Sequence, residues 1–130
     1  MDPEQFTEQA LLGIQQAQNH ARQAHHQAIE PEHILRGLIS ISDSVVRQLL
    51  EHLEVDIDQV LSHLDEMVAS FPITPPEQAG QYLSQRGQQA INQAETYTEQ
   101  FHDSFIGADV LFLACVEQTS LPFIDQDKLQ

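Results

Sequence analysis

Basic residues are scarce in this sequence. Its 130 residues include five lysines and arginines against 20 aspartates and glutamates, which gives a formal net charge of -15. Lys128 is the only lysine. Proteins that bind nucleic acid or anionic membranes draw their affinity from basic side chains that contact phosphates. The composition therefore argues against both classes of partner, and solubility is the simpler explanation of the acidity.

Long apolar runs and cysteine pairs are also missing. No stretch of about 18 apolar residues could cross a bilayer, and no basic start followed by an apolar segment marks a secretory signal. We therefore expect a cytoplasmic protein. The single cysteine, Cys115, cannot form an internal disulfide, and it lies in the apolar run from Val110 to Val116. This setting is typical of a buried, inert thiol.

Motifs that carry chemistry are absent as well. No glycine-rich loop ends in Lys-Ser or Lys-Thr, so the chain cannot hold ATP in the P-loop manner. Four histidines, His20, His25, His26 and His33, are close in sequence and could bring two imidazoles near one metal ion. No cysteine or His-Glu-x-x-His pattern completes a tetrahedral site around them. We expect no enzyme activity, no cofactor and no metal.

What the sequence does contain is a series of amphipathic helices, with 41% hydrophobic residues to form one core. Apolar residues at steps of four and three predict a helix capped by Thr7. Glu30-Pro31-Glu32 should open a second helix, because proline and carboxylates suit a first turn. Ser42 or Asp43 is expected to cap a third helix, and Asp56 a fourth. The stripe of the first helix consists of Ala10, Ile14, Ala17, Ala21, Ala24 and Ala28.

The chain repeats itself with an offset of 77 residues. Ser84 falls on the cap residue Thr7, and Asp109 falls on Glu32, which opens the second helix. The sequence therefore predicts an all-α fold of two pseudo-twofold-related helical repeats. Further coincident positions are Ile91 on Ile14, Ala94 on Ala17, Phe101 on Ala24 and Phe105 on Ala28.

We expect one domain over residues 1–130, with repeat one at 6–70, a connector containing proline and glycine at 71–83, and repeat two at 84–130. The second repeat is incomplete. Leu121-Pro122-Phe123-Ile124 can form a short third helix, but no counterpart of the Asp56–Val68 helix follows it. Either the natural protein continues, or the second copy is shorter.

Four stretches resemble the N-terminal repeat domain of Clp-type AAA+ chaperones. They are Phe-Thr-Glu-Gln-Ala at 6–10, Ile-Glu-Pro-Glu-His-Ile-Leu-Arg-Gly-Leu at 29–38, Leu-Ser-Gln-Arg at 83–86 and Asp-Ser-Phe-Ile at 103–106. The Ile-Glu-Pro-Glu-His form and the Ser-Phe-Pro start of the connector are most similar to the ClpB disaggregase branch. ClpC-type members usually carry Gly-Thr-Glu-His in both copies, which this chain lacks.

The resemblance implies a non-catalytic module in front of two ATPase rings in a hexamer. Its partners would be unfolded or aggregated client proteins, adaptor proteins and the AAA+ motor of the same polypeptide. The resemblance places Thr7, Asp103 and Asp109 at the polar part of the client surface. The alternative is that Thr7 is only a helix cap and that the two aspartates only cap or flank helix starts. Exposed Ile91 and Val110 are expected to line a shallow apolar groove between the repeats.

Two alternatives remain at this point. In ClpC-like relatives, acidic residues at Glu32 and Asp109 would face a guanidinium-bearing ligand such as a phosphoarginine-marked client. His-Ile-Leu-Arg-Gly at 33–37 also resembles the motif of a histidine phosphotransfer domain. Against this second alternative, His33 falls in a first helical turn beside two carboxylates, and the second copy has Val110 at the equivalent position.

Overall fold

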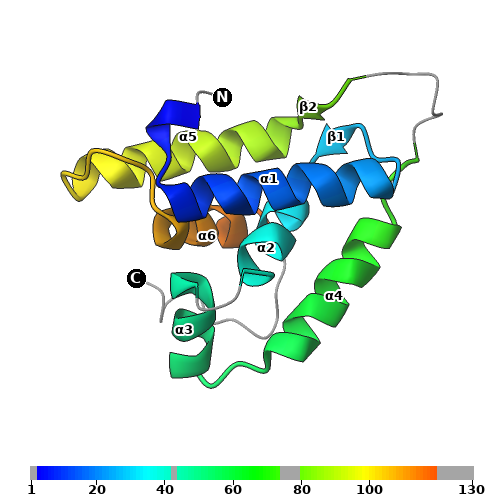
Figure 1. Ribbon diagram of the computed structural model, residues 1–130, viewed down its shortest axis with the longest axis horizontal. Helices are drawn as coiled ribbons and strands as arrows, with labels where there is room; N and C mark the ends of the chain where they lie inside the picture. The colour runs from blue at the N-terminus through cyan, green and yellow to red at the C-terminus, as the bar shows by residue number, and fades with distance from the viewer. Residues whose placement is uncertain (1–2, 42–43, 74–79, 120–130) are drawn as a thin grey trace.

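The computed structural model describes residues 3–41, 44–73 and 80–119. Within these ranges the chain forms six α-helices, one short 3₁₀ helix and two short strands (Figure 1). The all-α expectation is confirmed, and no helix in these ranges is long and apolar enough to span a bilayer. The elements are η1 (Pro3–Gln5), α1 (Glu8–Gln23), β1 (Ala28–Ile29), α2 (Pro31–Ile39), α3 (Val45–His52), α4 (Ile57–Ala69), β2 (Tyr82–Leu83), α5 (Gln85–Gln100) and α6 (Ala108–Glu117).

The two long helices, α1 and α5, are equivalent in length and in the way they start and stop. The hydroxyls of Thr7 and Ser84 cap them, each accepting a hydrogen bond from the backbone N–H three residues later, at 3.3 and 2.9 Å. Both helices end just before a residue with left-handed backbone, His25 with φ 62° and His102 with φ 60°. These cap and stop residues are related by the 77-residue offset.

Two short parallel bridges tie the repeats together, and the same offset relates them. Ile29 in β1 pairs with Leu83 in β2, and Phe6 pairs with Ile106. Beside each bridge, the amide of the residue that caps α1 or α5 donates to the carbonyl of Ile106 or Ile29, at 3.0 Å in both cases. This exchange of partners confirms two pseudo-twofold-related repeats.

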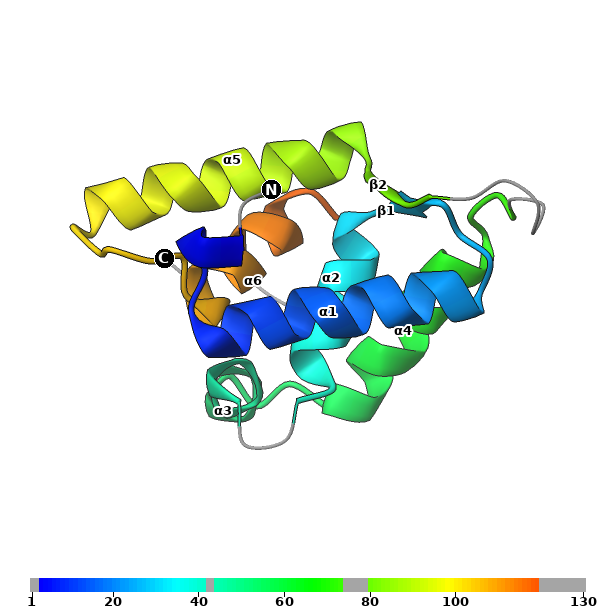
Figure 2. The same cartoon turned by 45° about the horizontal axis from the view of Figure 1, so that its top comes forward.

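The core forms where the second helices of the two repeats meet. α1 packs on α2, α5 packs on α6, and α2 contacts α6 between the long helices (Figure 2). α4 extends the packing on the side of α2. Cys115 is buried as expected, and burial raises the pKa of its thiol. The largest fully buried apolar side chains are Phe112, Ile14, Ile34, Leu35, Leu38, Ile39, Leu50, Leu64, Ile91 and Leu111.

Two details of the helix assignment were wrong. The hydroxyl of Ser44 caps α3 by accepting from the Arg47 N–H at 3.1 Å; Ser42 and Asp43 lie outside the described residues. Ala28 belongs to β1, because α1 stops at Gln23 ahead of the left-handed turn. The expected helix at 121–124 lies outside the described residues, and the proposed repeat boundaries stay a prediction.

Candidate partner-binding site

The seam between the repeats has two ends, each built around one of the parallel bridges. We call the β1–β2 bridge with Ser84, His26 and Glu32 the closed end. The Phe6–Ile106 bridge with Thr7, Asp103 and Asp109 is the open end. The equivalent pairs under the 77-residue offset are Thr7 and Ser84, Asp103 and His26, and Asp109 and Glu32.

At the closed end, Glu32 is buried beneath an arginine from the other repeat. Nη2 of Arg86 donates to Oε2 of Glu32 at 2.7 Å and to the carbonyl of Gln118 at 2.6 Å, while Nη1 lies 3.6 Å from Oε1 of Glu30. The Ser84 hydroxyl donates to the same Glu30 oxygen at 2.5 Å. The hydrogen bond to Glu32 raises the pKa of Arg86, and Oε1 of Glu32 has no hydrogen-bond partner among the described residues.

A pair of buried histidines completes the closed end. The Glu30 N–H donates to Nδ1 of His33 at 2.9 Å, so the ring proton is on Nε2, which donates to Nδ1 of His26 at 3.1 Å. The ring of Phe71 packs on both imidazoles, with centroids 5.4 Å from His33 and 5.9 Å from His26. Burial, and then the neighbouring His26, lower the pKa of His33 to about 4.

This geometry disfavours the phosphotransfer reading of the sequence. A phosphoryl-accepting imidazole needs an accessible nitrogen, whereas His33 has no exposed surface and uses both nitrogens in hydrogen bonds. The same hydrogen bonds disfavour metal binding by His33, because a proton on Nε2 leaves that nitrogen with no lone pair for a metal ion. Among the described residues, no group of three or more metal-ligating side chains is found.

At the open end, the equivalent polar residues lie at the surface. Thr7 is half-buried at its cap position, and Asp103 and Asp109 are exposed. Oδ1 of Asp109 accepts a hydrogen bond from the Val110 N–H at 2.9 Å. Asp103 also borders a hollow of about 210 Å3, which brings it next to the bridge residue Ile106. The hollow is lined by Gln5, Glu95, Thr98, Glu99, Asp103, Ser104 and Ile106.

Two exposed aromatic rings lie in the same turn as Asp103, and the sequence analysis did not single them out as site residues. Phe101 is 59% exposed and Phe105 is 54% exposed in the turn between α5 and α6. The ring of Phe101 stacks on Tyr97 with centroids 6.4 Å apart. The available signal was the replacement of Ala24 and Ala28 of the first repeat by phenylalanine in the second.

The expected apolar groove residues are not at the surface. Ile91 is 1% exposed and Val110 is 6% exposed, so the prediction that they form an exposed groove was wrong. Both belong to the hydrophobic core, and α6 buries seven of its ten residues, so Val110 has no face to present to solvent. Glu32 is also withdrawn from solvent, so the exposed members of the expected site are Asp103 and Asp109, with Thr7 partly exposed.

Comparison with known families resolves which fold this pseudo-symmetric unit represents. Residues 5–125 match the family described as the Clp repeat (R) N-terminal domain. This chain belongs to the Clp repeat N-terminal domain family. The Clp repeat domain is 31% identical to the chaperone protein ClpB of Prochlorococcus marinus over 109 residues, which is 84% of this chain and 12% of that protein. It is 27% identical to ClpB of Staphylococcus epidermidis over 90% of this chain and 14% of that protein.

Solved structures share the fold. The N-terminal domain of Hsp104 from Candida albicans matches with a TM-score of 0.79 and 21% identity, covering 87% of this chain and 74% of that one. The N-terminal domain of the ClpV1 ATPase from the E. coli EAEC Sci1 type VI secretion system matches with a TM-score of 0.84 and 17% identity. The match covers 98% of this chain and 82% of that one. The Clp repeat domain therefore has the predicted architecture, and it spans about an eighth of the length of the ClpB relatives.

Proposed function

We propose that this Clp repeat domain is a non-catalytic module that captures unfolded or aggregated proteins, or the adaptors that deliver them, for an AAA+ motor on the same polypeptide. The ClpB relatives are named chaperones, and the match covers only a small part of each. On this proposal, ATP hydrolysis belongs to modules outside the chain, the domain itself needs no cofactor, and it works in the cytoplasm of the cell.

The open end carries this proposal. Asp103 and Asp109 are exposed where their counterparts at the closed end are buried, and two half-exposed phenylalanines lie in the turn that contains Asp103. Burying the exposed rings against a client would contribute about 25 cal/mol of binding free energy per Å2 of apolar surface. The carboxylates favour cationic residues in the client. Two exposed rings and a few polar side chains make a small contact compared with the ~1,600 Å2 of a standard interface, so we expect capture by one domain to be weak. Several copies acting on one client would raise the avidity.

A guanidinium-bearing client at Glu32 is the less favoured alternative. The carboxylate of Glu32 is buried and already holds the guanidinium of Arg86. Its counterpart Asp109 is exposed at the other end of the seam, so the two acids do not face one ligand. A phosphoarginine-marked client would have to displace Arg86 and open the closed end.

Titration with fluorescein-labelled casein, an unfolded protein, tests the open end. We expect the double variant Phe101→Ser/Phe105→Ser to bind casein about tenfold more weakly, because each change removes apolar area that contacts the client. Asp103→Ala should have a smaller effect that disappears at high salt. Both rings are exposed, so the fold should be retained, as circular dichroism would verify.

The matched control is Tyr82→Ser, which removes a ring that is 57% exposed at the closed end. Casein binding should survive this change. Equal weakening by Tyr82→Ser, or unchanged binding in the folded double variant, would show that the open end does not hold the client.

A further inference from the structure

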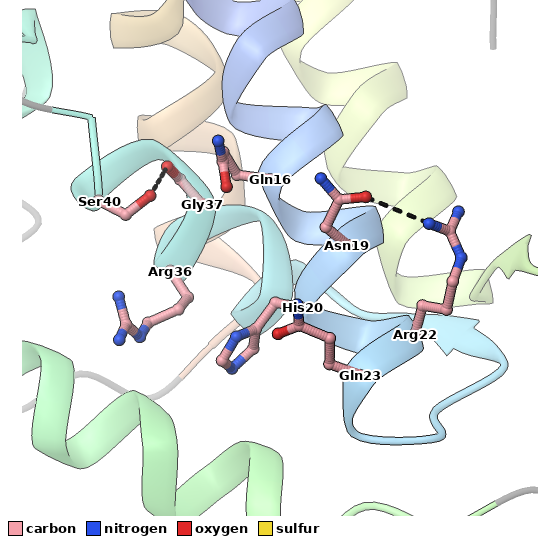
Figure 3. Close-up of a pocket in the computed structure, with 8 residues that line it drawn as sticks. All are labelled: Gln16, Asn19, His20, Arg22, Gln23, Arg36, Gly37 and Ser40. Carbon is pink, nitrogen blue, oxygen red and sulfur yellow. Dashed lines mark hydrogen bonds between the residues drawn. The ribbon is translucent and has the colours of Figure 1, made fainter.

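Two of the four arginines in this acidic chain line one hollow of about 360 Å3 between α1 and α2. Arg22 lies near the end of α1, and Arg36 lies on α2 facing α4 (Figure 3). Gln16, His20 and Gln23 of α1 also line the hollow, with His20 and Gln23 between the two arginines in Figure 3. The hollow lies along the last turns of α1, whereas the open end lies at its first residue.

The hollow contains more hydrogen-bond donors than the protein uses. Nε of Arg36 donates to Asp65 at 2.9 Å, but its two terminal nitrogens make no hydrogen bond to the described residues. Arg22 donates one bond, from Nη1 to Asn19 at 3.2 Å. The side chains of Gln16, His20 and Gln23 make none within the described part of the chain. Guanidinium groups are donors only, and their fork matches carboxylates, so the ligand that fits these groups is rich in anionic acceptors.

The equivalent surface of the second repeat is not open in this way. The 77-residue offset places Tyr97 on His20, Leu113 on Arg36 and Glu117 on Ser40. There the Tyr97 hydroxyl donates to Oε1 of Glu117 at 2.6 Å, and Tyr97 packs against the core. An open basic hollow is thus not imposed by the packing of the two helices, since the second helix pair fills the same place with its own side chains.

We propose that this hollow binds an acidic segment of a partner protein, with Asp or Glu carboxylates paired to Arg22 and Arg36. The two arginines stand on opposite sides of the lining side chains in Figure 3, so an extended segment with more than one carboxylate fits better than a single small ion. The chain has a net charge of -15 and five basic residues, so few other positions would attract an acidic segment. The proposal is independent of client capture at the open end.

Asp65 is the internal competitor for this site. Its carboxylate, which is 51% exposed, occupies Nε of Arg36, whose side chain is 25% exposed. An incoming carboxylate would share or replace that contact. Removing the Asp65 charge should therefore tighten binding of an acidic segment, an effect that a purely structural role for Arg36 would not produce.

Fluorescence anisotropy with a fluorescein-labelled oligoglutamate peptide at low ionic strength measures this binding. We expect saturable binding, absent for an oligoglutamine peptide, that weakens about fivefold with each of Arg22→Gln and Arg36→Gln. The charge-matched control is Gln89→Glu on the exposed side of α5, which changes the net charge equally and should leave binding unchanged. Asp65→Asn should strengthen it.

Three results would overturn the proposal. The first is that Gln89→Glu weakens peptide binding as much as the arginine variants do, which would assign the effect to net charge. The second is unchanged peptide binding by the folded arginine variants. The third is displacement of the peptide by inorganic phosphate at equal carboxylate and phosphate concentrations, which would indicate a site for free anions. If the arginine variants do not fold, the Asp65→Asn chain decides, because failure to tighten peptide binding contradicts the competition.

Discussion

His33 occupies a position in which a neutral imidazole is required. Its Nδ1 accepts from the start of α2, its Nε2 donates to His26, and Phe71 covers both rings. A second proton would abolish the acceptor at Nδ1 and leave a charge with no exposed surface. The hydrogen bonds that build the closed end therefore depend on the protonation state of one residue.

Acid should destabilise the domain through this residue. The pKa of His33 is about 4 in the folded chain and 6.5 when unfolded, so the unfolded state binds more protons between these values. The stability that depends on neutral His33 is complete above pH 6.5 and falls as the pH drops toward 4, with a loss of about 2 kcal/mol at pH 5. Urea denaturation at a series of pH values measures the free energy of unfolding.

His33→Phe should flatten this pH dependence between pH 4 and 6.5, whatever it does to the absolute stability. His52→Gln is the control, since His52 is exposed at the end of α3, and it should leave the pH profile of the parent chain unchanged. A parent profile that is flat over the same range would contradict a buried neutral His33.

At the scale of single residues, sequence patterns predicted what depends on neighbours along the chain. Thr7 and Asp56 cap helices as expected, because a cap is a contact with a backbone N–H only two or three residues away. Exposure of Val110 was misjudged because it depends on which elements pack around α6. The apolar run from Val110 to Val116 carried the missing information, since a helix that is apolar all round belongs inside a protein.

Among the elements, α1 and α2 cross at two glycines. A Cβ placed on Gly37 would lie 2.1 Å from the carbonyl oxygen of Gly13, so the backbones touch where no side chain fits. At the equivalent position of the second repeat, Ala114 is accommodated with no exposed surface. The first helix pair is therefore closer at its crossing than the second.

Gly37→Ala should destabilise the fold by about 2 kcal/mol or more, because the overlap is with backbone and outweighs the gain of about 1 kcal/mol in helix propensity. The reciprocal change Ala114→Gly should cost about 1 kcal/mol from propensity and lost packing. Thermal denaturation of both variants checks the difference. A Gly37→Ala chain as stable as the parent would show that the helices can separate without penalty.

At this scale the helices were predictable and the bridges were not. Period-three-and-four stripes extend over many residues, whereas strands of two residues have no period to detect. The stop at His25 was missed for a similar reason, because a left-handed turn by a residue other than glycine leaves no clear sequence signal. Because the apolar stripe continues past Gln23, the helix was expected to extend to Ala28, which instead lies in β1.

For the molecule as a whole, Arg86 is the charged contact that joins the two repeats at the closed end. It lies on α5 and pairs with Glu32 on α2, whose side chain is 2% exposed. We expect Arg86→Gln to destabilise the domain by about 2 kcal/mol, because it leaves a buried carboxylate without its cation while Arg86 itself is partly solvated. Urea denaturation measures the loss.

Glu32→Gln removes the buried carboxylate that Arg86→Gln leaves without a cation. The double variant Arg86→Gln/Glu32→Gln should recover much of the stability lost by Arg86→Gln alone, since two neutral amides do not leave an unpaired ion. Additive losses in the double variant would mean that Arg86 stabilises the fold through its bond to the Gln118 carbonyl instead.

The 77-residue offset predicted which residues are equivalent, but not which end of the seam is closed. Closure depends on Arg86 and Phe71, whose partners at the closed end lie far away in sequence. Phe71 lies between α4 and β2, in the predicted connector, and Arg86 falls on Gln9, which cannot supply a cation at the other end. The cation that closes one end is therefore present in the second repeat and absent at the equivalent position of the first.

That asymmetry affects which surface tolerates substitution. The two repeats give the seam two equivalent ends, and the covered end holds the repeats together through buried contacts. Mutations in the turn around Asp103 meet solvent, so they cost little packing energy and are free to accumulate. If the open end binds clients as proposed, substitutions in this turn would change which proteins are bound while leaving the buried contacts between the repeats intact.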